Sequence, residues 1–207
     1  MAATSLQELF VEELRDMYDG EKRLTKALPK MARATEDGPL RAAFTTHLKE
    51  TERQIARLEQ VFRTVGEKPR GKKCDGIMGI VEEGNTMMQE LERGPVLDAA
   101  LIAGAQKAEH YEIASYGTLA YFAEMLGNDR AKDLLGQTLD EEKAADEKLS
   151  TIAKSDVNRD ALMANNEEEG GDGFMMRNVR RAATSFGVAN DASRRRRSTG
   201  RKSTKKK

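Results

Sequence analysis

Apolar side chains recur at steps of three and four residues through most of the first 154 positions, which is the period of an amphipathic helix. The first stretch begins at SLQE, a capping box with Ser5 as the cap and Glu8 three residues later. The pattern predicts four long helices over about 5–35, 39–65, 95–126 and 129–154, and a shorter, Met-rich helix over 75–91. Gly66 and the sequence GND at 127–129 mark helix ends.

The connection between the second and third long helices carries the short helix, which is the crossover arrangement of ferritin-like four-helix bundles. We therefore expect an all-α, ferritin-like bundle over residues 1–154. Beyond residue 154 the periodicity fades, and NNEEEGGDG at 165–173 has the composition of a linker. Residues 155–207 are expected to form a disordered linker and basic tail.

The net charge of zero conceals an asymmetry between the two parts of the chain. Residues 155–207 hold 13 Lys and Arg against 7 Asp and Glu, so the first 154 residues carry the compensating negative charge. Residues 194–207 contain nine Lys and Arg and no acid. Such a segment can neutralise phosphates, so we expect non-specific DNA binding through residues 194–207, or else a role in solubility or in contacts with an acidic neighbouring subunit.

Composition also restricts where the protein acts. With one cysteine, Cys74, the chain cannot form an internal disulfide, which fits the reducing cytoplasm. The N-terminus lacks the basic and apolar regions of a secretory signal, and no stretch approaches 18 consecutive apolar residues. We expect a cytoplasmic protein with no membrane segment.

Each long helix carries a carboxylate on or beside its apolar stripe, close to the middle of the helix. The acids are Glu21, Glu50, Glu112 and Glu142, and each lies within about two residues of its helix midpoint, or roughly 3 Å along the axis. Four helices packed side by side would bring these acids together at one level inside the bundle.

Buried carboxylates raise one another's pKa values and destabilise the fold unless cations accompany them. None of the four stripes contains Lys or Arg. Carboxylates that bridge two divalent ions form the di-iron and di-manganese sites of ferritin-like bundles. The spacing therefore predicts a metal site, and the alternative is a metal-free structural bundle whose acids lie at the edge of the core.

Further polar side chains lie one turn from these acids. His47 and Gln54 share a helical face with Glu50, Glu109 precedes Glu112 by three residues, and Asp146 follows Glu142 by four. These four side chains could complete the coordination or orient the other ligands. His110 points away from Glu112 on the helical wheel and is read as a surface or dimer-contact residue.

Five long stretches of the chain are distinctive: LFVEELRDMYDGEKRLTKALPKMA, HLKETERQIARLEQVF, GEKPRGKKCDG, DAALIAGAQKAEHYEIASYGTL and LLGQTLDEEKAADEKL. In these stretches, which fall within residues 5–154, the chain closely resembles the YciE/YciF family of bacterial stress proteins. The resemblance implies a rubrerythrin-related helical bundle that forms a homodimer and holds a dinuclear metal centre, with ferroxidase-like activity. It does not extend through the basic tail.

The chain departs from the broader ferritin-like pattern, which pairs Glu-x-x-His on two helices. The third position after Glu50 is Arg53, and the third after Glu142 is Ala145; Gln54 and Asp146, each at the fourth position, are the candidate substitutes.

Three functions follow from these observations. The first is oxidation of iron(II) by dioxygen or peroxide at a site for two iron ions, with manganese as the other candidate metal. The second is nucleic-acid binding by the tail on a dimeric scaffold, and the third is the metal-free bundle.

Overall fold

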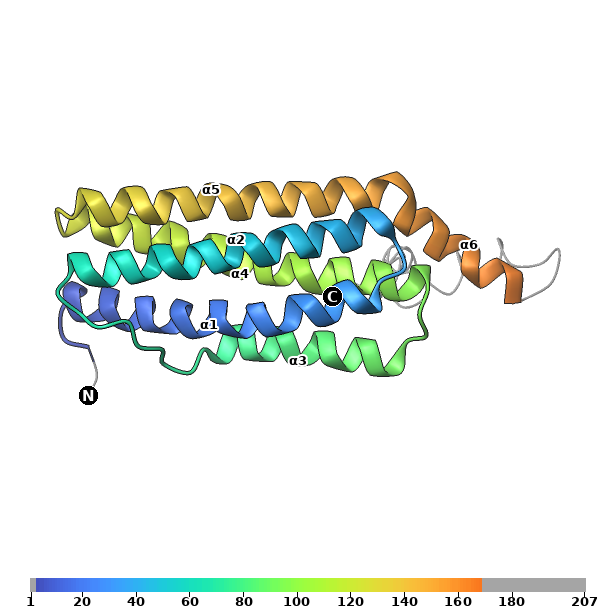
Figure 1. Ribbon diagram of the computed structural model, residues 1–207, viewed down its shortest axis with the longest axis horizontal. Coiled ribbons are helices and arrows are strands. Elements are labelled where there is room, and N and C mark those ends of the chain that lie inside the picture. The colour runs from blue at the N-terminus through green and yellow to red at the C-terminus, as the bar shows by residue number, and fades with distance from the viewer. Residues whose placement is uncertain (1–2, 169–207) are drawn as a thin grey trace, which may run out of the picture. The chain divides into compact units, whose positions relative to one another are not determined.

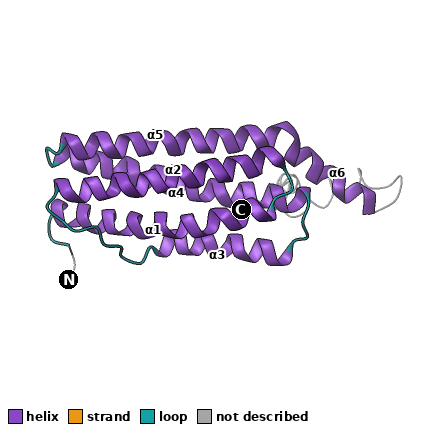
Figure 2. Ribbon diagram, viewed as in Figure 1, coloured by secondary structure: helices purple, strands orange, loops and turns teal. Residues whose placement is uncertain are grey.

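The computed structural model describes residues 3–168, which form six α-helices, one short π-helix and no strand (Figure 1, Figure 2). The elements are α1 (Leu6–Ala34), α2 (Gly38–Thr64), α3 (Asp75–Glu90), α4 (Pro95–Met125), α5 (Asp129–Ile152), the π-helix η1 (Ala153–Val157) and α6 (Asn158–Glu168). The all-α fold class predicted from the sequence is confirmed, and the first five helices begin and end within about two residues of the predicted positions.

Four helices form the bundle, and α3 lies outside it. α1 packs against α2 and α4, while α5 packs against α2 and α4, so each long helix has two long neighbours. The connection from α2 to α4 contains α3, which packs on α1 and α4 along one side of the bundle (Figure 1). This is the ferritin-like arrangement with a crossover helix that the pattern predicted.

Side-chain caps fix where several helices begin. The Ser5 hydroxyl accepts a hydrogen bond from the backbone N–H of Glu8 at 3.2 Å, as the capping box predicted. Asp37 and Asn128 cap α2 and α5 in the same way. α2 and α4 end just before Gly66 and Gly127, which adopt φ values of 72° and 69° that favour glycine.

The buried apolar side chains divide into two clusters, one on each side of a polar layer. The first cluster contains Leu24, Phe44, Leu101 and Leu149, and the second contains Leu14, Phe62, Leu119 and Leu135. Along each long helix the buried side chains between the two clusters are polar. This layer holds the buried acids, so apolar packing encloses them from both ends of the bundle.

Helical structure continues past residue 154, where the sequence placed the end of the bundle. Val157 in η1 is buried and belongs to the first apolar cluster, so the chain still packs on the core at this point. The chain divides into two compact units, Met1–Asn165 and Asn166–Lys207, and of the second the structure describes only the end of α6. The basic segment 194–207 lies outside the described residues. No described helix combines the length and apolar character needed to cross a membrane.

Candidate metal centre

Four buried side chains come together in the polar layer: His47 from α2, Glu109 and Glu112 from α4, and Glu142 from α5. Each offers one ligand atom, and these atoms all lie within 4.8 Å of one another. The imidazole Nε2 of His47 is 3.3 Å from an oxygen of Glu109 and 3.8 Å from an oxygen of Glu142. Three carboxylates and one imidazole, contributed by three helices, therefore surround one point.

Glu21 of α1 is fully buried at the same level but has a different partner. The phenol of Tyr116 donates a hydrogen bond to one of its carboxylate oxygens, while the other oxygen has no partner within the described part of the chain. Burial and then the charge of Glu142 raise the pKa of Glu21, whereas the Tyr116 hydrogen bond and the charge of His47 lower it, so Glu21 interacts electrostatically with the group of four. Glu21 therefore lies beside the group and could join it.

Glu50 occupies the solvent side of the site. Its carboxylate lies 3.6 Å from Nδ1 of His47, and its side chain is 28% exposed. The interaction with the nearby His47 imidazole is the largest cause that lowers the pKa of Glu50. Of the four acids that the sequence placed at one level, Glu21, Glu112 and Glu142 are buried there, whereas Glu50 connects the buried histidine to the surface.

Burial raises the pKa values of the buried carboxylates far above their ordinary value. The pKa of Glu109 rises to about 8 and that of Glu142 to about 9. Desolvation is the largest cause in both, and the charges of neighbouring acids add to it. The pKa of Glu112 is also raised well above its usual range by burial, then by the charges of Glu142 and Glu21. These shifts favour the protonated forms of Glu109 and Glu142 near neutral pH in the metal-free protein.

His47 responds to the same acids in the opposite direction. Burial by itself would lower the pKa of the imidazole, but the neighbouring Glu50 carboxylate and the charges of Glu142 and Glu21 raise it. His47 does not satisfy all of the buried acids, because neither oxygen of Glu112 has a hydrogen-bond partner among the described residues.

Arg57 brings a basic side chain to the edge of the layer, although none of the four apolar stripes contains Lys or Arg. It lies outside the apolar stripe of α2, yet its side chain is only 13% exposed and donates two hydrogen bonds of 2.9 Å to Glu141 of α5. Gln54, a candidate ligand in the sequence, donates to the same carboxylate at 3.1 Å. Arg57 thus pairs with Glu141 at the edge of the layer, while the acids at its centre keep their raised pKa values.

Asp146 is the candidate ligand that lies apart from the group. Its carboxylate accepts a hydrogen bond from Gln106 at 3.0 Å and lies 3.5 Å from His110. A position four residues after Glu142 is one turn further along α5, and here it faces the flank of α4. His110, whose side chain is 70% exposed, is at the surface as expected.

The sequence reasoning missed Tyr116, Arg57 and Glu141. Tyr116 had a visible signal, because it follows Glu112 by four residues and so shares its inward face. Arg57 and Glu141 lie on the edges of their helices, and only the packing of α2 against α5 brings them together.

The residues present fit a divalent metal. Carboxylate and imidazole donors bind iron, manganese and zinc, and Glu112 has oxygens free to coordinate. A bound cation would replace the protons that the raised pKa values indicate and would remove the repulsion among the acids.

The fold and the site together define a class: a ferritin-like helical bundle with a buried His/Glu group that could bind metal. Residues 5–162 match the family described as domain of unknown function DUF892, and the chain belongs to that family.

Among characterised relatives, the chain is 48% identical to protein YciF of Escherichia coli over 162 residues, which is 78% of this chain and 98% of YciF. The crystal structure of that stress protein superposes with a TM-score of 0.73 and covers 75% of this chain and 99% of YciF. The YcfI protein of Rhodopseudomonas palustris is 46% identical, with a TM-score of 0.70 over 72% of this chain and 94% of its own. A Xanthomonas campestris protein that is 22% identical shares the fold. It superposes with a TM-score of 0.61 and covers 78% of this chain and 99% of its own.

Proposed function

We propose that this chain is a ferritin-like stress protein that binds two iron(II) ions in the polar layer and oxidises them with dioxygen or peroxide. One observation carries the proposal: three carboxylates and a histidine, all buried, offer ligand atoms within 4.8 Å of one another. Buried acids that raise one another's pKa values are unfavourable in a purely structural core. They are the donors that a site for divalent iron requires.

The chain's own residues have separate roles in this proposal. Glu109, Glu112, Glu142 and His47 hold the substrate ions, and Glu21, oriented by the Tyr116 phenol, completes the set from α1. Glu50, which is partly exposed and contacts His47, is the first carboxylate that an ion meets from solvent. The apolar clusters on either side keep bulk water out, which strengthens every charge interaction in the layer.

An anaerobic iron(II) titration of the full chain, followed by mixing with air-saturated buffer, tests the proposal. We expect two equivalents to bind and to oxidise faster than iron in buffer alone. Glu142→Ala should lose this binding, whereas the matched change Glu124→Ala, at an exposed position on α4, should keep it. Failure of the unaltered chain to bind iron, or oxidation no faster than in buffer, would favour the metal-free bundle.

The same titration with manganese(II) distinguishes the two candidate metals. A manganese affinity much higher than that for iron(II) would overturn the assignment of iron. Sedimentation of the metal-free and metal-loaded forms would test the homodimer that the family resemblance implies.

A further inference from the structure

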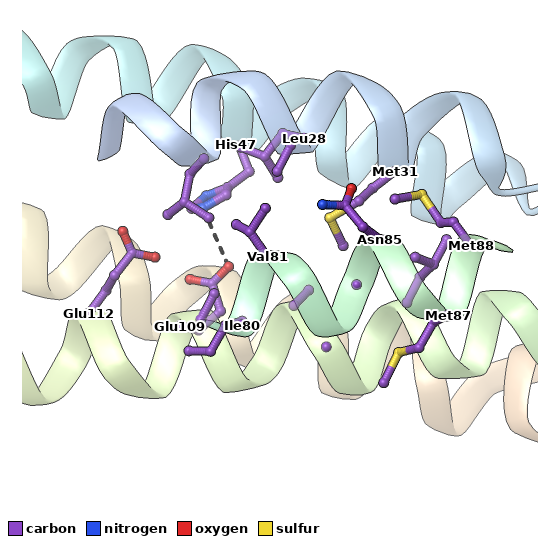
Figure 3. A pocket seen from close by; sticks show the side chains of 17 residues that line it. Leu28, Met31, His47, Ile80, Val81, Asn85, Met87, Met88, Glu109 and Glu112 are labelled. Atoms are coloured by element: carbon purple, nitrogen blue, oxygen red, sulfur yellow. Dashed lines mark ion pairs between the residues drawn. The ribbon is translucent and has the colours of Figure 1, made fainter. Parts of the chain in front are cut away.

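A narrow cavity of about 30 Å³ leads from the candidate metal centre to the space between α1, α3 and α4. His47, Glu109 and Glu112 lie at one end, and Met31, Met87 and Met88 at the other (Figure 3). Leu28, Ile80 and Val81 are among the apolar side chains that line it. The cavity therefore joins an apolar region beneath α3 to the group of buried acids.

Two glycines inside helices help to keep this cavity open. Gly84 of α3 and Gly104 of α4 both line it, and neither has a positive φ that would require glycine. Glycine within a helix costs about 1 kcal/mol relative to alanine. A Cβ at Gly84 would meet no atom within 4 Å, and one at Gly104 would meet only the Met87 sulfur, at 3.9 Å. Larger side chains would thus occupy open space at both positions.

The buried end of the cavity carries unsatisfied polar atoms. Glu112 is 1% exposed, and neither of its carboxylate oxygens has a hydrogen-bond partner in the described chain. A packing defect in an apolar core would have no such group. The cavity therefore leads to carboxylate oxygens that have no hydrogen-bond partner among the described residues.

The size and lining of the cavity select a small, uncharged molecule. A volume of about 30 Å³ accommodates a diatomic molecule and excludes organic substrates, since one water-sized probe needs roughly 10–15 Å³. Apolar cavities in proteins stay dry and take up nonpolar gases such as xenon. Ions and hydrogen peroxide are strongly hydrated and would be excluded by the apolar walls.

A second pocket, of about 170 Å³ between α2 and α5, is more polar. Its lining combines Glu50, Glu141 and Lys148 with apolar side chains, and it also reaches His47 and Glu109. Hydrated solutes have a polar route to the site here, so the apolar cavity is not needed for them.

We propose that the cavity beneath α3 admits and holds dioxygen, and that dioxygen is the oxidant in the function proposed above, on which this inference rests. In the reaction, two iron(II) ions each lose one electron. One dioxygen molecule takes up these two electrons and two protons and leaves as hydrogen peroxide. The iron ions and the peroxide use the polar pocket between α2 and α5, so the oxidant and the cation approach from different sides.

The first test uses dissolved dioxygen as a paramagnetic probe of the metal-free full chain, labelled with ¹³C at the methionine methyl groups. If dioxygen occupies the cavity, the methyl protons of Met87 and Met88 should relax faster under oxygen pressure than those of Met125 and Met163. The latter two are exposed, at 60% and 53%, and sense only oxygen in solution. Equal or smaller effects at Met87 and Met88 would overturn the proposal, whether or not the protein oxidises iron.

The second test compares oxidants in Gly84→Leu and in a matched control, Gly79→Leu, which lies in the same helix at an exposed position with no atom near its Cβ. Gly84→Leu should slow iron oxidation by dioxygen several-fold while leaving oxidation by hydrogen peroxide and iron(II) affinity unchanged. Gly79→Leu should change none of these. Equal slowing with both oxidants, or none with dioxygen, would overturn the proposal. Failure of the unaltered chain to oxidise iron would instead reject the proposed function.

Discussion

At the scale of single residues, the hydrogen bond from Tyr116 to Glu21 is the clearest case of a side chain that stabilises a buried carboxylate. The Tyr116 side chain is fully buried, and its phenol donates to Glu21, which lowers the pKa of that carboxyl against the larger effect of desolvation. Tyr116→Phe should therefore raise the pKa of Glu21 above its present value of about 8. It should also reduce the free energy of unfolding by about 1–2 kcal/mol.

Carboxyl ¹³C NMR titration and urea unfolding measure these two effects in the metal-free chain. Tyr121→Phe is the matched control, because Tyr121 lies on the same helix and is 59% exposed. It should leave both quantities unchanged. An unaltered Glu21 titration in Tyr116→Phe would show that the phenol does not support this carboxylate.

Glu112 is the opposite case, a buried carboxylate that accepts no hydrogen bond from the described residues. Because neither of its oxygens has a hydrogen-bond partner among the described residues, Glu112→Leu should stabilise the metal-free protein by about 1–3 kcal/mol at mildly alkaline pH. It should also abolish stabilisation by added iron(II) or manganese(II). Thermal unfolding with and without metal measures both effects, and Glu52→Leu, at an exposed position on α2, should change neither. A destabilised Glu112→Leu protein in a chelator would contradict this account.

The candidate site could be predicted in part from helical spacing. Spacing identified Glu21, Glu112 and Glu142 as buried and selected His47 and Glu109 as neighbours, because residues three or four apart share a face. In the structure Glu50 is partly exposed, and Asp146 accepts a hydrogen bond from Gln106 of α4. The rotation of a helix about its own axis is fixed by packing against neighbouring helices. The apolar stripe of one helix therefore does not show whether a residue at the edge of the stripe faces the core or the solvent.

At the scale of helices, the turn between α1 and α2 is held by a residue from elsewhere in the chain. Asp98, in the first turn of α4, is 3% exposed and accepts hydrogen bonds from the backbone N–H groups of Glu36 and Asp37, the latter at 2.9 Å. Asp98→Ala would leave these groups unpaired and should reduce the free energy of unfolding by about 2–4 kcal/mol.

Urea unfolding measures this effect, and Asp129→Ala is the control. Asp129 is also in the first turn of its helix but is exposed, so its loss should reduce stability by less than about 1 kcal/mol. Similar losses in the two variants would show that a general helix-terminus effect, and not the bonds to the α1–α2 turn, explains Asp98.

The helices themselves were predictable because local signals agree with the packing. The capping residues Ser5 and Asn128, and the terminating glycines Gly66 and Gly127, lie in the sequence next to the stripes that they bound. Two features were not predicted, a local cap by an unusual capping residue and a contact with the distant core. Cys74, which sequence reasoning left without a role, caps α3 by accepting from the Ile77 N–H, and Val157 extends the core beyond the expected end of α5.

At the scale of the whole molecule, the buried acids determine how stability depends on pH. The pKa values of Glu21, Glu109 and Glu142 rise from an ordinary 4.5 to between about 8 and 9 on folding, so the folded state binds more protons than the unfolded state in this interval. The free energy of unfolding of the metal-free protein should therefore fall as the pH rises from about 5 to about 9. His47, whose pKa is also raised, contributes in the same direction.

Urea unfolding in a chelator at several pH values measures this dependence, with a total change of a few kcal/mol expected. Bound metal favours the deprotonated carboxylates and should reverse the slope. A metal-free stability that rises between pH 5 and pH 9 would mean that the acids are paired with cations in the folded state.

The basic segment 194–207 gives the last prediction, which depends on charge alone. Full-length protein should bind duplex DNA without sequence preference, and the logarithm of the binding constant should fall linearly with the logarithm of salt concentration, by roughly 0.9 for each phosphate neutralised. A chain that ends at Glu168 keeps α6 and the acidic bundle but loses all nine basic residues of the segment, so it should not bind. Replacing Arg194, Arg195, Arg196 and Arg197 by Gln keeps the length of the tail and should reduce both the affinity and the salt slope, because fewer phosphates are neutralised. Equal affinity of the full and shortened chains in gel shifts, or no binding at about 50 mM salt, would assign the segment a role other than nucleic-acid binding.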